Sequence, residues 1–405
     1  MKLKRQDIVF FVLGVLSIAT YVWPYYMTVL IPGFNGIMIM VFRYMSYLIT
    51  VMTAIICRKE LFALLKKSLV FIVLCLALYI ALLLSTVFHS GKQAELIEPF
   101  IKVFFFSLLL AVATANKSSY MLKGMAFVYN AIIVISLINA FVPFPGLSGV
   151  EYFATTKNVY FRFIFLGIML DAYLDYREAE KLRIRTLVFL GMIVVTTLLF
   201  RSSTGFAVSF VSFALLLIKT VFMKGEMKMA KSWLFLLIAV AIGILVVFLR
   251  QISFYADFIE SVFGKDASFT GRVDLWDQVL KLIAKNPVFG YGHLSMDGYI
   301  IFGNEHWMSA SCHNLYLDIM VEAGIIGLVI FFIMLLILLR NIDRCEYSSM
   351  AQTFSILFFA CLIAFNFEVY FNLGQYIYTF PMLFFLSFCF AGSPRRHRKL
   401  RIIWK

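Results

Sequence analysis

The sequence predicts an all-α membrane protein: a polytopic bundle of about twelve transmembrane helices with one long loop outside the membrane. Two observations carry this prediction. The 405 residues are 62% hydrophobic and only 14% charged, and their mean hydropathy is +0.93, which is far more apolar than a soluble domain. The apolar residues also gather into runs of about 17 to 25, each long enough to cross roughly 30 Å of hydrocarbon.

Twelve such runs follow one another along the chain, and none shows the alternating pattern of an outer-membrane barrel. They are 8–28, 36–57, 69–88, 99–115, 119–141, 158–175, 184–200, 204–222, 232–250, 314–339, 349–366 and 374–391. Because a backbone in lipid must satisfy its hydrogen bonds internally, each run is predicted to be a helix. Residues 1–405 are therefore expected to form one integral membrane domain, with an uncleaved first helix.

Lysine and arginine are distributed unevenly between alternate connections. With the N-terminus placed in the cytoplasm, the inner segments hold 24 of the 36 basic residues, whereas the short outer loops hold only Lys92, Lys157 and Arg201. This bias predicts that both termini are cytoplasmic. The net charge of +14 is then mostly a property of the face toward anionic lipid, so membrane lipid is an expected partner and nucleic acid is not.

Residues 251–313 are the one long outer loop, between the ninth and tenth predicted helices. Apolar residues recur at spacings of three and four over 273–283, which predicts an amphipathic helix. Thr270 is a candidate N-cap, and Pro287 is a stop signal. Trp276 would suit the headgroup level, so this helix is predicted to lie on the outer leaflet. The alternative is a surface helix that only closes the bundle.

Five basic residues are predicted at the outer ends of helices or in this loop, where they suit a diphosphate, since guanidinium groups bind phosphate oxygens in pairs. They are Lys102, Arg162, Arg201, Arg250 and Arg272. For each one alone, the alternative is a side chain that extends to the membrane interface.

Arg43 lies deeper, within the second predicted helix. An ionised group in a membrane helix needs a partner. Asp171, Asp318 and Glu322 are candidates to pair with it or with other cations, and a structural ion pair is the favoured interpretation.

His313 opens the tenth predicted helix directly after the polar loop. An imidazole there is accessible to water and near the predicted cations, as a general base must be. His293 and His306 lie in the same loop, but the spacing of the three histidines matches no compact metal-ligand motif, so no metal site is predicted. Further along the helix, Gly324 and Gly327 would let a neighbouring helix approach closely.

Two motifs in this region resemble the signature of the O-antigen ligase and polymerase family. One is H-N-x-x-L followed by E-x-G-x-x-G (His313, Asn314, Leu317, Glu322, Gly324 and Gly327); the other is G-R-x-x-x-W followed by P-x-x-G-x-G (Gly271, Arg272, Trp276, Pro287, Gly290 and Gly292). Residues 201–217 are similar to a third family segment, although the arginine precedes the serines here. The resemblance covers the twelve-helix plan and is most specific over residues 200–330.

The resemblance implies a metal-independent membrane glycosyltransferase without a cofactor, in the bacterial plasma (inner) membrane, with its active site facing outward. An undecaprenyl-diphosphate-linked oligosaccharide would be transferred to an acceptor glycan, and a flippase and a chain-length regulator are the protein partners to expect. The candidate catalytic residues are His313, as the base, and Arg272, on the leaving group. The remaining candidates are Arg162, Arg201, Arg250 and Lys102 for binding the diphosphate, and Asn314, Trp276 and Glu322 in support.

Several functions remain open at this stage. A polymerase is favoured over a ligase because nothing in the sequence suggests a docking region for a second large acceptor. A flippase or another secondary transporter should show two similar halves with broken helices near the midplane, whereas this chain concentrates its polar residues at one mouth. A non-catalytic scaffold would leave the two motifs unexplained.

Overall fold

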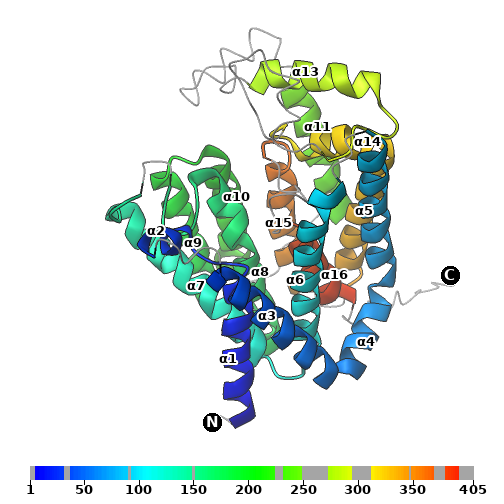
Figure 1. Cartoon of the computed structure of the whole chain (residues 1–405). Coiled ribbons are helices and arrows are strands. Elements are labelled where there is room, and N and C mark those ends of the chain that lie inside the picture. Colours follow the sequence, from blue (N-terminus) through cyan, green and yellow to red (C-terminus); the bar gives the residue numbers. More distant parts are fainter. Residues whose placement is uncertain are drawn as a thin grey trace, which may run out of the picture.

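The computed structural model describes residues 5–31, 37–89, 93–147, 151–223, 231–248, 272–293, 312–345, 348–368 and 379–391, and these residues form helices and connections without a named strand. Figure 1 shows the helices of the first half: α1 (Arg5–Ala19), α2 (Tyr25–Leu30), α3 (Ile37–Ile56), α4 (Arg58–Lys67), α5 (Leu69–His89), η1 (Gln93–Leu96), α6 (Ile97–Ala115), α7 (Tyr120–Phe141) and α8 (Lys157–Ala179). The second half consists of α9 (Ile184–Leu199), α10 (Ser203–Leu217), η2 (Ile218–Phe222), α11 (Ser232–Phe248), α13 (Arg272–Lys285), α14 (Leu315–Asp343), α15 (Ser348–Ala364) and α16 (Thr379–Ala391).

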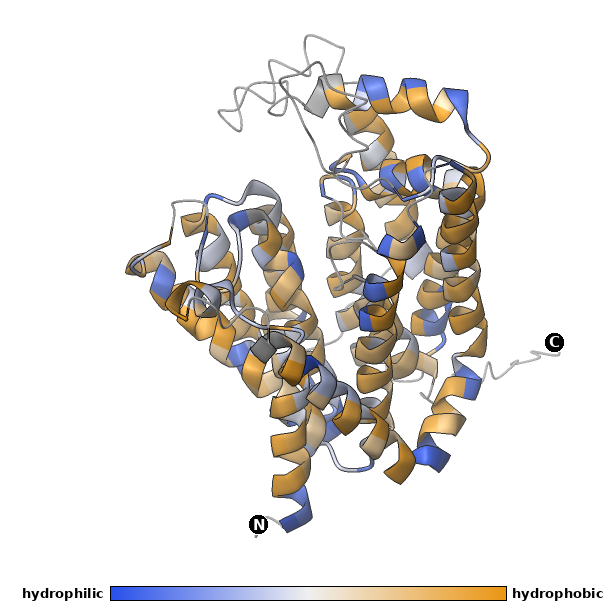
Figure 2. Cartoon of the chain, in the orientation of Figure 1, coloured by the Kyte–Doolittle hydropathy of each residue, from blue (hydrophilic) through white to orange (hydrophobic). Residues whose placement is uncertain are grey.

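Within the described residues, each predicted apolar run overlaps a helix or two consecutive helices. In the part of the chain that the structure describes, five helices are long and apolar enough to cross a membrane: Leu69–His89, Gln93–Ala115, Tyr120–Phe141, Ser203–Phe222 and Leu315–Asp343. Five shorter apolar helices accompany them: Met40–Ile56, Ile184–Leu199, Ser232–Leu245, Ser348–Ala364 and Phe380–Ala391. Figure 2 shows hydrophobic residues along most of the helical surface and hydrophilic residues near the helix ends. The count of twelve spans and the side on which the termini lie stay predictions.

The first predicted run, 8–28, is wrong as a single helix. Helix α1 ends at Ala19, and α2 begins at Tyr25 after Pro24. Proline cannot donate a backbone hydrogen bond and disfavours a helical residue before it, so the chain turns here. The N–H groups of Tyr25 and Tyr26 donate instead to the carbonyl oxygens of Ala154 and Phe153, at 2.9 and 3.0 Å.

Glycines allow α1 and α7 to cross closely. A Cβ atom at Gly14 would overlap the carbonyl of Met121, and one at Gly124 would overlap the carbonyl of Phe11. Small residues permit such approach between membrane helices, where packing rather than hydrophobic exclusion drives association. Helices α1 and α7 are therefore packed in direct backbone contact.

Two groups of helices are visible in Figure 1: α7, α9 and α10 on one side, and α5, α6 and α14 on the other. Helix α10 packs on α15 between them. The fully buried Lys219 of η2 stabilises this contact. Its Nζ atom donates to Ser349 O and Thr353 Oγ1 of α15, both at 2.9 Å, and to Tyr176 Oη at 3.1 Å. A buried ammonium group needs such oxygen partners.

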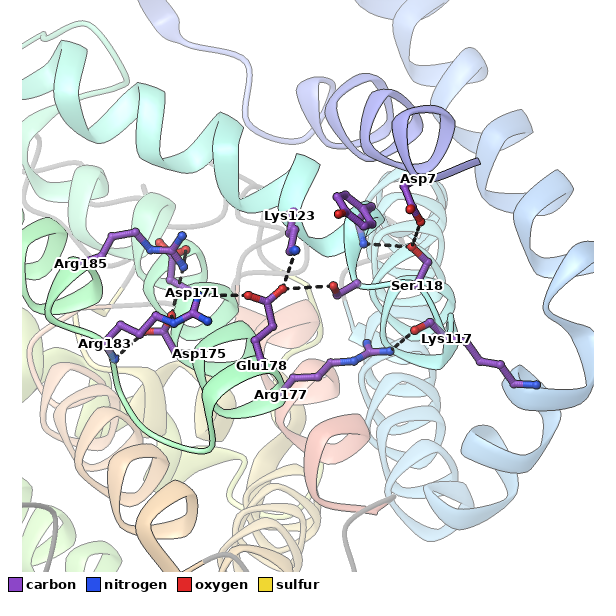
Figure 3. Close-up of polar contacts among 12 residues, drawn as sticks. Asp7, Lys117, Ser118, Lys123, Asp171, Asp175, Arg177, Glu178, Arg183 and Arg185 are labelled. Carbon is purple, nitrogen blue, oxygen red and sulfur yellow. Dashed lines mark hydrogen bonds and ion pairs between the residues drawn. The ribbon is translucent and has the colours of Figure 1, made fainter. Parts of the chain in front are cut away.

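We call the end of the bundle that carries α13 the outer end, and the end that carries α4 the inner end, following the predicted orientation. An ion-pair network closes the inner end (Figure 3). Glu178 accepts from Lys123 at 2.6 Å and from Arg183 at 3.1 Å. Arg185 lies 3.1 Å from the buried Asp175 and 3.5 Å from the buried Asp171. The two buried carboxylates of α8 thus have a shared cation.

Candidate functional site

His313 lies at the outer end, immediately before α14, in an unusual backbone conformation. Its φ angle is 48°, in the left-handed region that non-glycine residues rarely adopt. Asn314 follows as the N-cap of α14, with its Oδ1 atom accepting from the N–H groups of Tyr316 and Leu317 at 3.0 and 3.1 Å. Strained residues persist only where surrounding contacts hold them, and they cluster at functional sites.

The His313 imidazole faces the carboxylate of Glu368. The Nδ1 atom lies 3.3 Å from Glu368 Oε2, and the two side chains are 35% and 6% exposed. Two bonds fix this pairing: Leu315 N–H donates to Phe365 O at 2.8 Å, and Asn314 Nδ2 donates to Asn366 O at 3.1 Å. The end of α15 and the start of α14 therefore form one junction.

Sequence reasoning missed Glu368. A signal was present, because Glu368 is the single Asp, Glu, Lys or Arg between positions 347 and 394. An isolated carboxylate just past the outer end of a predicted membrane helix is a candidate functional group.

Helix α13 confirms the predicted amphipathic helix, but Trp276 faces the protein interior and not lipid headgroups. The Trp276 side chain is fully buried, and its Nε1 atom donates to Cys312 O at 2.8 Å. The indole packs inward because its N–H has a buried partner there. Arg272 begins α13, but its side chain, Thr270, His306 and Arg250 lie outside the described residues.

Arg162 lies on α8, which packs against the group of α7, α9 and α10, and Arg201 lies between α9 and α10. Arg162 is half-buried near the outer start of α8, and the exposed Arg201 forms the turn between α9 and α10 with a φ angle of 54°. The nearby Tyr152 ring stacks on Phe200 with centroids 3.5 Å apart. Burial raises the pKa of Tyr152, while the positive charge of Arg201 opposes this rise. Like His313, Arg201 is a predicted site residue in a strained backbone conformation.

Lys102 and Arg43 share one carboxylate, Glu98. Lys102 Nζ lies 2.6 Å from Glu98 Oε1, and Arg43 Nη1 lies 2.8 Å from the same atom. Arg43 thus forms an ion pair as predicted, but with Glu98 and not with one of the three candidate acids. Of these, Asp171 pairs with another cation, Arg185, and Asp318 and Glu322 lie on α14. A role for Lys102 in binding a diphosphate stays a prediction.

Glu322 lies beside His293 in a break in α14. Gly324 has non-helical angles (φ 63°, ψ −164°) inside this helix. His293 Nδ1 is 3.6 Å from Glu322 Oε1, and His293 Nε2 is 3.9 Å from Glu95 Oε2. Glu322 therefore supports the loop after α13.

The loop from Pro287 to Gly292 repairs the hydrogen bonding of this break. On the N-terminal side of the break, the carbonyls of Val321 and Glu322 accept from Tyr291 and Gly292 at 2.7 and 2.9 Å; on the other side, Ile325 N–H donates to Pro287 O at 2.8 Å. The expectation that a neighbouring helix approaches Gly324 was wrong, since this loop does so. The P-x-x-G-x-G motif thus forms the loop that hydrogen-bonds to the helix break made by the E-x-G-x-x-G motif.

Among the described residues, no group of three His, Cys, Asp or Glu side chains is arranged to hold a metal ion. Metal independence stays a prediction from the ligand spacing.

Comparison with known proteins points to one family. Residues 187–332 match the O-antigen ligase family. The chain is 25% identical over 171 residues to the exopolysaccharide production protein ExoQ of Rhizobium meliloti, a match that covers 36% of this chain and 37% of ExoQ. It is 28% identical over 141 residues to a protein of Rickettsia conorii named "Putative polysaccharide ligase RC0486", covering 32% of each chain. Each match spans only about a third of the relative, and no solved structure matches.

The matched residues 187–332 include Arg201, all of α13, His313 and the break in α14. The family match therefore covers His313 and the two interlocking motifs, whereas Glu368 lies outside the matched residues. In this multi-pass membrane protein, residues 187–332 are therefore similar to the O-antigen ligase family, and the two relatives named above carry exopolysaccharide production and polysaccharide ligase in their names.

Proposed function

We propose that the protein is a polysaccharide polymerase of the bacterial plasma (inner) membrane. It transfers an undecaprenyl-diphosphate-linked glycan to a hydroxyl group of an acceptor sugar at the outer face. The family supports polysaccharide biosynthesis, and ExoQ carries exopolysaccharide production in its name. The donor, the acceptor and the side of the membrane are parts of the proposal.

The observation that carries the proposal is the pair formed by His313 and Glu368. A buried carboxylate beside Nδ1 favours the tautomer with the proton on Nδ1, which leaves Nε2 as a base. The imidazole is only partly buried, and we propose that it faces a substrate outside the membrane. A positioned base of this kind suits the deprotonation of a sugar hydroxyl.

In the proposed step, the acceptor oxygen attacks the anomeric carbon of the donor. The bond between that carbon and the diphosphate oxygen breaks, and its electron pair leaves with the diphosphate. The hydroxyl proton passes to His313 Nε2, and Glu368 stabilises the resulting imidazolium. Arg272, Arg162 and Arg201 are proposed to stabilise the negative charge on the leaving diphosphate, with Arg250 and Lys102 as further contacts.

The test is reconstitution of the purified chain in lipid vesicles with an undecaprenyl-diphosphate-linked oligosaccharide as donor and acceptor. Wild type should produce a ladder of products that differ by one repeat. His313→Ala should lower turnover by about 10²- to 10⁴-fold, and Glu368→Gln by at least about tenfold because the imidazole loses its orienting charge. His306→Ala is the control and should stay near wild type. Normal polymer formation by folded His313→Ala would refute the catalytic assignment.

The same experiment separates a polymerase from a ligase, which is the printed name of the Rickettsia relative. A ligase would transfer the glycan once, to a different acceptor, and would give no ladder with donor alone. Movement of intact donor across the vesicle membrane without a new glycosidic bond would indicate a transporter.

Activity should survive excess chelator, because side-chain cations take the place of a metal on the diphosphate. Loss in chelator with recovery on adding a divalent ion would contradict this part.

A further inference from the structure

Cys312, the residue before His313, is held through both sides of its backbone. Its N–H donates to Asp318 Oδ1 at 2.9 Å, and its carbonyl accepts from Trp276 Nε1 at 2.8 Å. Both bonds are buried, and the Cys312 side chain is fully buried. One partner belongs to α14 and the other to α13, so two helices meet on this one residue.

The carbonyl of Cys312 and the N–H of His313 belong to one rigid peptide plane. A hydrogen bond to that carbonyl fixes the orientation of this peptide plane. The φ angle of His313 is measured relative to the same plane. Asn314, as the N-cap of α14, fixes the chain on the other side of His313. The left-handed φ of 48° is therefore determined by the indole of Trp276 on one side and the helix start on the other.

The cluster that contains Trp276 also contacts the residue before Glu368. The indole lies in a buried cluster with Val247, and Leu317 and Phe367 pack against this cluster. Phe367 directly precedes Glu368, whose carboxylate faces His313. Trp276 therefore bonds to the backbone before the imidazole, and its cluster packs against the residue before the carboxylate.

We propose that Trp276 and Asp318 are positioning residues, which hold His313 in its reactive placement and tie it to the helix that begins with Arg272. This role rests on the proposed function of His313. It also accounts for the joint presence of the two motifs, because the tryptophan of G-R-x-x-x-W donates to the carbonyl directly before H-N.

The first test uses the thiol of Cys312 and needs no activity. In the purified full chain, the other cysteines (Cys57, Cys75, Cys345, Cys361 and Cys389) are replaced by serine or alanine, and the rate of reaction with a hydrophilic maleimide is measured. Trp276→Phe keeps a ring but removes the N–H donor, and should raise the labelling rate about tenfold or more because the segment opens locally. Trp233→Phe, at a 42% exposed tryptophan of α11, is the control and should leave the rate unchanged.

The second test separates placement of the base from binding of substrate. Trp276→Phe and Asp318→Leu should each lower kcat about 10- to 100-fold while KM for the lipid-linked donor stays within about twofold, since a misplaced base slows only the chemical step. Asp318→Asn keeps an oxygen acceptor for Cys312 N–H and should retain most of wild-type kcat. The double variant should lose much less than the product of the single losses, because both residues act through one backbone segment.

The outcomes distinguish this role from the proposed function. If His313→Ala is inactive but Trp276→Phe and Asp318→Leu keep wild-type kcat in folded protein, the positioning role is refuted and the proposed function stands. If Asp318→Asn loses as much activity as Asp318→Leu, the carboxylate does more than accept the Cys312 N–H, and the assignment of Asp318 is wrong. If His313→Ala stays active, the proposed function is refuted. Unchanged thiol labelling in Trp276→Phe refutes the anchoring of Cys312.

Discussion

Gly290 and Gly324 meet backbone to backbone where the loop after α13 enters the break in α14. A Cβ atom at Gly290 would lie 2.7 Å from Gly324 N and 2.6 Å from Val321 O. Both glycines have positive φ angles, 70° and 63°. This close contact lets the loop replace the hydrogen bonds that the break removes from the helix, so a buried backbone keeps its partners.

Gly290→Ala should therefore destabilise the protein. The substitution combines a steric overlap with a backbone conformation that alanine rarely adopts, and we expect a loss of at least about 2 kcal/mol in unfolding free energy. Thermal unfolding of detergent-solubilised protein measures it. Gly191→Ala is the matched control, because a Cβ there would lie at an ordinary 3.4 Å from Phe213 Cε2. Equal stability of the two variants would show that the loop does not interlock with α14.

Arg272→Lys should slow transfer although it keeps the positive charge. Lysine lacks the planar fork that binds two phosphate oxygens at once, and loss of such stabilisation at a developing charge typically costs about 10²-fold. Initial rates in the vesicle assay measure the effect. Arg340→Lys, at an exposed residue of α14, should be neutral. A variant with both Arg272→Ala and His313→Ala should be much less than multiplicatively impaired, since both side chains serve one transition state.

The orientation in the membrane is testable by labelling. Cysteines introduced at Lys92, Lys157 and Lys265 should react with an impermeant thiol reagent in intact cells. A cysteine at Lys181, an exposed residue between α8 and α9, should react only after the cells are opened. Labelling at position 181 from outside would overturn the predicted topology.

The inner-end network should make stability depend on pH. Burial alone would raise the pKa of Glu178, but the ion pairs with Lys123 and Arg183 outweigh it and hold the pKa below its usual value of 4.5. A carboxylate with a depressed pKa contributes stability that is present above its unfolded pKa and is lost as the pH falls through its folded pKa. Glu178→Gln should therefore lower the midpoint of thermal unfolding at pH 7, and its difference from wild type should shrink below about pH 4.5.

A difference between Glu178→Gln and wild type that grows as the pH falls would contradict this assignment. Asp277→Asn is a suitable comparison, because Asp277 lies on α13, far from this network along the chain.

Sequence alone determined where most helices lie. Each apolar run must form helix because lipid offers no partner to a backbone N–H or carbonyl, and this constraint acts locally. The same local logic identified the helix α13 and placed the start of α14 next to His313, whereas the N-cap role of Asn314 was seen only in the structure. The first run failed because Pro24 stops a helix even inside an apolar stretch.

The partners across the bundle were decided by tertiary structure. Arg43 pairs with Glu98 rather than with the acids on α8 or α14, Trp276 turns inward to Cys312, and Glu368 reaches His313 from the end of another helix. Hydropathy and spacing place a residue along its own helix, whereas these contacts depend on how helices rotate and which ends meet. That outcome follows from packing and from the need of every buried polar group for a partner, so only the folded bundle could assign it.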